Sequence, residues 1–252
     1  MFIEFFMAKE LRATYAGETL YGILIRTIGL SVFAALIGFV GYSNIFKGKI
    51  NRNKARTYTF VAVAFVIAVN NFPFVSLALG EVSVNLTVGY TLLYALLCIS
   101  VAAFEELAFR GFVFMLALEK LPKNRKGAFV AIVISSAIFG AIHFVNVFAG
   151  AGVGSVVLQM GYSSLIGALA TVMLLKTHNI FYSIALHAIY NFNGGLVPEF
   201  GEGQIWTTGE VIFTAVVSVL VAVYVIWEFF GMSDGEVKEL FEKGSGETDD
   251  NS

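Results

Sequence analysis

The sequence has few of the charged residues that soluble domains place on their surface. Only 13% of its 252 residues are charged and 58% are hydrophobic, whereas a soluble domain carries about 25% charged residues. The apolar residues form continuous runs, which excludes the alternating pattern of a transmembrane β-barrel. The composition therefore predicts an all-α, polytopic bundle of transmembrane helices.

Cysteine, proline and net charge are also scarce, and each excludes something. Cys98 is the only cysteine, which excludes a disulfide within these residues and a cysteine-based zinc cluster. Three prolines are compatible with long uninterrupted helices. A net charge of −2 gives no basis for nucleic-acid binding. The predicted partners are the lipid bilayer and a peptide or protein substrate.

The apolar runs predict about seven membrane spans in a single transmembrane domain, residues 1–232. Basic loops follow the first and third spans, and the positive-inside rule places them, with the C-terminus, on the cytoplasmic side. An interfacial helix over residues 2–16 and a second span interrupted at Asn70, Asn71 and Pro73 leave six or eight spans open. An acidic tail, 233–252, is expected to form a short helix (234–243) and then to be disordered. The predicted spans are 20–42, 57–79, 90–118, 127–148, 155–175, 179–197 and 210–230.

Three charged residues interrupt the third apolar run. Glu105, Glu106 and Arg110 would each cost about 2.5–3.5 kcal/mol at bilayer depth, so they are functional candidates by default. Glu106 and Arg110 are four residues apart and can pair on one helix face. Glu105 lies about 100° further around the helix and is left freer.

Two later spans carry partners at the same helical spacing. Phe139 and His143 are four residues apart, and so are His187 and Asn191. The assembled set holds carboxylates, imidazoles and an amide. A carboxylate in a cavity of low dielectric suits a general base, and amide or imidazole N–H groups can stabilise an oxyanion. Because the set offers no good covalent nucleophile, attack of water on a carbonyl is the natural reaction class.

These residues form three motifs, Glu-Glu-x-x-x-Arg at 105–110, Phe-x-x-x-His at 139–143 and His-x-x-x-Asn at 187–191. In order and spacing they resemble the motifs of the CAAX protease and bacteriocin-processing (CPBP, or Abi) family, which includes the CAAX prenyl endopeptidase Rce1, over about residues 88–197. The resemblance implies an intramembrane endopeptidase. It implies that Glu105, assisted by His143, activates water, that His187 and Asn191 form the oxyanion hole, and that Glu106 and Arg110 support them. The spacing of four residues places Phe139 as an aromatic wall one turn below His143.

The implied substrate is a prenylated CaaX protein, or in a prokaryote a signal-peptide remnant, a peptide pheromone or a bacteriocin precursor. Zinc is the mechanistic alternative, with Glu105, His143 and His187 as its three ligands. Metal-free catalysis is favoured because a His-Glu-x-x-His motif is absent and Asn191 is a poor zinc ligand. The other function classes are a peptide-binding immunity protein without catalysis, and a proton-coupled transporter, which would usually bring broken helices and repeated halves.

Overall fold

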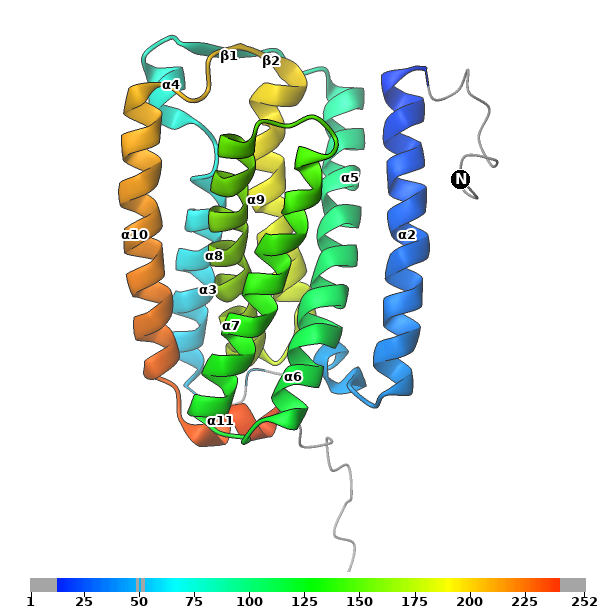
Figure 1. Cartoon of the computed structure of the whole chain (residues 1–252), viewed down its shortest axis with the longest axis vertical. Helices are drawn as coiled ribbons and strands as arrows, with labels where there is room; N and C mark the ends of the chain where they lie inside the picture. Colours follow the sequence, from blue (N-terminus) through cyan, green and yellow to red (C-terminus); the bar gives the residue numbers. More distant parts are fainter. Residues whose placement is uncertain (1–12, 49, 51–52, 241–252) are drawn as a thin grey trace, which may run out of the picture.

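A computed structural model describes residues 13–240 except 49, 51 and 52. Long helices run side by side through the bundle, and a two-stranded sheet lies at one end (Figure 1). The predicted interfacial helix over 2–16 falls almost wholly outside the described residues. The main helices are α2 (Tyr15–Phe39), α3 (Lys54–Val69), α4 (Phe74–Ala78), α5 (Val88–Glu106), α6 (Met115–Lys120), α7 (Arg125–Ile142), α8 (Val153–Thr177), α9 (Ile180–Phe200), α10 (Thr208–Phe230) and α11 (Asp234–Glu239).

The all-α polytopic fold is confirmed. In the described part of the chain, five helical stretches are long and apolar enough to cross a membrane: 15–39, 88–120, 125–147, 153–177 and 208–230. Two other predicted spans correspond to α3, which has only 16 residues, and to α9, which carries the polar residues of the third motif. Both pack within the bundle. The count of seven spans therefore stays a prediction.

The interruption predicted in the second span is present as an early end of the helix. α3 ends at Val69, and Pro73 precedes the separate five-residue helix α4. Asn71 turns across to α9 and donates a hydrogen bond from Nδ2 to the Tyr190 carbonyl at 2.9 Å. Asn71 thus joins two helices where the chain leaves α3.

The helix that carries the first motif is continuous from α5 to α6. Ala102 lies within regular α-helix. The irregularity comes later, in a π-helix over Leu107–Phe114 that starts directly after Glu106. A π-turn holds one residue more than an α-turn, and such turns occur frequently at functional sites. Gly111 lies on this segment where α2 approaches, since a Cβ there would be 2.5 Å from Ile37 Cδ1.

Polar side chains fix where several helices begin. At these positions the side-chain oxygen accepts a backbone N–H from the first helical turn, which satisfies a donor that the helix itself leaves free. The capping residues of α2, α7, α9 and α10 are Thr14, Asn124, Asn179 and Thr207.

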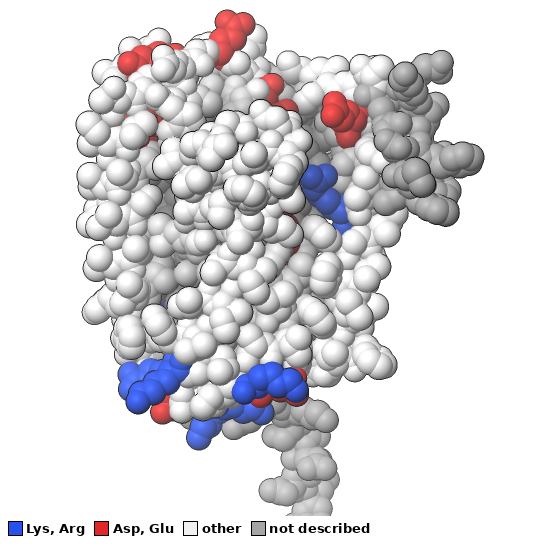
Figure 2. Space-filling view, in the orientation of Figure 1, with Lys and Arg blue, Asp and Glu red and all other residues white. Residues whose placement is uncertain are grey.

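The two ends of the bundle differ in charge. Basic side chains gather at the end that carries α6 and α11, and acidic side chains appear at the opposite end (Figure 2). A buried network supports the basic end, where Glu228 lies 2.7 Å from Lys176 Nζ and 3.2 Å from Arg56 Nε. The asymmetry fits the positive-inside rule, and the cytoplasmic position of this end remains a prediction.

The C-terminal helix begins as predicted at Asp234, where Ser233 and Glu236 form a capping box. It ends at Glu239, earlier than expected, and the predicted disorder falls on residues 241–252, outside the described residues. At the other end, β1 (Val82–Val84) pairs antiparallel with β2 (Gly201–Gly203). This small sheet was not predicted. It ties the loop before α5 to the end of α9.

Candidate active site

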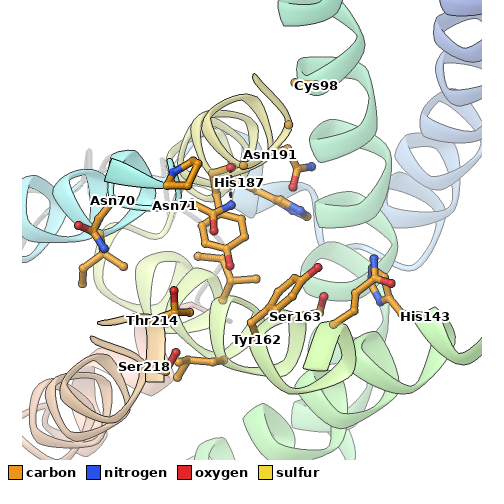
Figure 3. A pocket seen from close by; sticks show the side chains of 18 of the residues that line it. Asn70, Asn71, Cys98, His143, Tyr162, Ser163, His187, Asn191, Thr214 and Ser218 are labelled. Atoms are coloured by element: carbon orange, nitrogen blue, oxygen red, sulfur yellow. Dashed lines mark hydrogen bonds between the residues drawn. The ribbon is translucent and has the colours of Figure 1, made fainter. Parts of the chain in front are cut away.

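A cavity of about 480 Å³ lies between α3, α5, α7, α8, α9 and α10. Its wall contains the four residues predicted to be catalytic, Glu105, His143, His187 and Asn191, together with Phe139. Figure 3 shows His143 facing His187 and Asn191 across this space. The structure therefore brings residues from three separate helices to one buried site.

The two adjacent glutamates have different surroundings. The Glu106 side chain is fully buried, and its Oε1 lies 3.0 Å from Arg110 Nη1 and 2.8 Å from His187 Nδ1. The Glu105 side chain is 24% exposed and lines the cavity, which Glu106 and Arg110 do not. The pairing of Glu106 with Arg110, predicted from their spacing, is confirmed, and Glu105 is the carboxylate open to a ligand.

Arg110 is held by an aromatic ring as well as by charge. Its guanidinium is 1% exposed and lies 4.4 Å from the centre of the Phe139 ring, a cation–π distance. Its contact with Glu106 is an ion pair without good hydrogen-bond alignment. Gly167 leaves the space for it, since a Cβ there would lie 2.8 Å from Arg110 Nη2. Glu106 and Arg110 thus compensate each other's charge inside the apolar core.

His187 connects both glutamates. Its Nδ1 contacts Glu106 Oε1 at 2.8 Å, and its Nε2 lies 3.5 Å from Glu105 Oε2. Because a carboxylate accepts hydrogen bonds, Nδ1 carries a proton. The buried carboxylate of Glu106 therefore fixes the orientation of the ring. This contact between the first and third motifs was not predicted.

His143 is oriented by its own helix. Its Nδ1 lies 2.9 Å from the Phe139 carbonyl, so this nitrogen is the donor and Nε2 is free to accept a proton. The Phe139 ring contacts both imidazoles edge-on, with centroids 5.3 Å from His143 and 5.7 Å from His187. Phe139 therefore contacts both imidazole rings, and the spacing argument that placed it next to His143 is confirmed.

Asn191 lies one turn from His187 on α9. Its backbone carbonyl accepts a hydrogen bond from the Tyr94 hydroxyl at 3.2 Å. The carboxamide lines the cavity, and within the described residues it has no hydrogen-bond partner. It is thus available to donate to a bound group.

The zinc alternative can be compared with this arrangement. Within the described residues, no three His, Cys, Asp or Glu side chains are placed to share one metal ion. The donor types of Glu105, His143 and His187 are suitable for zinc, but their positions here do not converge on a single point.

Several polar residues in the cavity wall were not predicted to belong to the site. The sequence predicts Asn70 and Asn71 only as an interruption of a helix, and it gives Glu210, Thr214 and Ser218 no role. The signal for these last three is their spacing of four residues, which puts polar side chains on one face of an apolar helix. All five line the same cavity.

The fold and the cavity define a multi-pass helical membrane protein with a buried site lined by ionisable side chains. Residues 87–193 match the family model of the type II CAAX prenyl endopeptidase Rce1-like proteins. Over this segment the chain is similar to the Rce1-like proteins, as the three motifs predict. The matched segment contains all three motifs. No curated protein and no solved structure matches the chain.

Proposed function

We propose that this protein is an intramembrane endopeptidase in which Glu105 activates a water molecule for attack on a peptide carbonyl. One observation carries the proposal: of two adjacent glutamates, Glu106 is neutralised by Arg110 whereas Glu105 reaches the cavity. A partly desolvated carboxylate with access to a substrate is a suitable general base.

The proposed reaction uses one proton transfer in each direction. Glu105 takes a proton from water, and the oxygen forms a bond to the carbonyl carbon. The lone pair of His143 Nε2 accepts a hydrogen bond from the other water hydrogen and orients the nucleophile. When the C–N bond breaks, the proton on Glu105 passes to the leaving nitrogen. The products are a carboxyl group and a free amine, and no covalent enzyme intermediate forms.

The oxyanion would be stabilised by α9. The Asn191 carboxamide donates one hydrogen bond, and His187 donates a second when its Nε2 is protonated. Glu106 supports that protonated ring through Nδ1, at 2.8 Å. Donors fixed before the reaction are the largest single source of rate enhancement in many hydrolases.

The substrate proposed from the family is a peptide with a prenylated cysteine near its carboxyl end. The test is cleavage of a quenched fluorescent farnesylated peptide by the detergent-purified protein, with and without a strong zinc chelator. Glu105→Gln and His143→Ala should abolish cleavage while the protein stays folded. Glu81→Gln, on an exposed turn, serves as the matched control and should cleave normally.

The outcomes separate the alternatives. Cleavage that survives chelation supports water activated by Glu105, whereas cleavage lost to the chelator and restored by zinc would require a metal at Glu105, His143 and His187. Full turnover by the Glu105→Gln variant would refute the proposed base. Tight binding of the peptide without cleavage by the wild type would favour the peptide-binding alternative.

A further inference from the structure

The cavity continues well beyond the candidate catalytic residues. Towards α3 and α10 it is lined by polar side chains, which we call the polar arm: Asn70, Asn71, Glu210, Thr214 and Ser218. Figure 3 shows Asn70, Thr214 and Ser218 on the side of the cavity away from His143. Glu210, Thr214 and Ser218 are successive residues at a spacing of four, so they share one face of α10. A polar stripe on an apolar helix that faces a cavity offers hydrogen-bonding groups to a polar occupant.

Glu210 is the charged member of the polar arm. It is 4% exposed, and its Oε2 accepts the Ser76 backbone N–H at 3.1 Å. Within the described residues no Lys, Arg or His forms an ion pair with it, and no group donates to its second oxygen. Among the described residues, the cavity wall thus holds a buried carboxyl group without a paired cation.

The position of the polar arm relative to the catalytic groups follows from α9. Asn71 donates to the Tyr190 carbonyl and also lies beside Gly194, three and seven residues after His187, which corresponds to about 5 to 10 Å of helical rise. An extended peptide advances about 3.3 Å per residue. A substrate chain cleaved near Glu105 would therefore reach the polar arm about two to three residues from the cleaved bond.

Charge determines the direction in which the chain runs. A peptide cleaved three residues before its end carries its own carboxylate at that distance on the C-terminal side, and Glu210 would repel it. The N-terminal side of the bond carries no such charge. Hydroxyl and amide side chains in the polar arm can hydrogen-bond the N–H and C=O groups of an extended chain.

We propose that the polar arm binds the substrate about three residues on the N-terminal side of the cleaved bond, and that Glu210 selects a basic side chain there. This inference rests on the proposed function and adds a specificity to it. Lys or Arg would supply the cation that Glu210 lacks. The long apolar stem of either side chain can lie along the wall formed by Val217 and Val221 while its charged end reaches Glu210.

The test uses farnesylated peptides in which Lys, or norleucine as its neutral isostere, is placed at each of the five positions that precede the farnesylated cysteine. At a position near the third, Lys should raise kcat/KM about tenfold over norleucine, as expected for a buried hydrogen bond to a charged group. Glu210→Gln keeps an acceptor for Ser76 N–H but removes the charge, so the Lys-to-norleucine ratio should fall to about one. Glu202→Gln, an exposed acidic residue at the same end, should keep the preference.

A separate measurement keeps this inference distinct from the proposed function. The same peptides can be titrated by fluorescence anisotropy against Glu105→Gln and against Glu105→Gln/Glu210→Gln, neither of which needs to cleave. A Lys preference in Kd that disappears in the double variant supports the polar arm even if the wild type cleaves none of the peptides. Equal Kd values for Lys and norleucine at all five positions, or a preference that survives Glu210→Gln, would overturn it.

Discussion

Removing the guanidinium of Arg110 should destabilise the protein severely, whereas removing it together with the Glu106 carboxylate should not. Both side chains are buried, at 1% and 0% exposure, with 3.0 Å between Nη1 and Oε1. Losing one member of such a pair leaves an uncompensated charge and costs about 3–5 kcal/mol, but replacing both by groups of similar volume is often neutral. Arg110→Met retains the contact with Phe139, and Glu106→Gln retains an acceptor for His187 Nδ1.

The assay is thermal unfolding of the purified protein in detergent. For a chain of this size, 1 kcal/mol shifts Tm by about 2–4 °C, so Arg110→Met should melt about 6–20 °C below the wild type. The Glu106→Gln/Arg110→Met double variant should recover most of that loss. It should nevertheless remain a poor catalyst, because the Glu106→Gln change weakens the contact that orients His187. A Tm of Arg110→Met within about 2 °C of the wild type would refute the reasoning, because the buried pair would then not be compensating charge.

Two further predictions concern other parts of the bundle. Asn191→Ala should lower kcat by about 10²–10³ with little change in KM, as for loss of one oxyanion donor; an unchanged kcat in steady-state cleavage would remove Asn191 from that role. Gly140→Ala should lower Tm because its Cβ would lie 2.6 Å from the Met160 carbonyl, whereas Gly161→Ala, which meets nothing within 4 Å, should gain about 0.5–1 kcal/mol from helix propensity. Equal melting temperatures for these two variants would show that α7 and α8 do not approach as closely as described.

The sequence could predict those features that depend on spacing along one helix. Spacing predicts that Glu106 pairs with Arg110 and that Glu105 stays apart from this pair. Spacing also predicts that Phe139 lies next to His143. It could not predict the π-helix that follows Glu106, because packing against neighbouring helices decides between an α-turn and a π-turn. For the same reason, the bridge that His187 forms to both glutamates depends on how α5 and α9 are placed.

The polar arm was missed for a related reason. Asn70 and Asn71 end a helix, and Thr214 and Ser218 are common in membrane helices, so each has an ordinary explanation when read singly. Only the folded chain shows that α3 and α10 turn these residues towards the cavity that contains Glu105. A site shared by helices far apart in sequence becomes visible once the faces of those helices are known.

The charges of the site also explain how a reaction with an anionic intermediate fits inside an apolar bundle. At rest Glu106 and Arg110 cancel, so Glu105 holds the negative charge that faces the cavity. In the proposed reaction Glu105 becomes neutral as it takes the proton from water, and the negative charge appears on the carbonyl oxygen instead. Charge is therefore moved over a few ångströms and not created, which avoids the large cost of a new charge at low dielectric. His187, 3.5 Å from Glu105 and bonded to Glu106, is suitably placed to stabilise the charge at both positions.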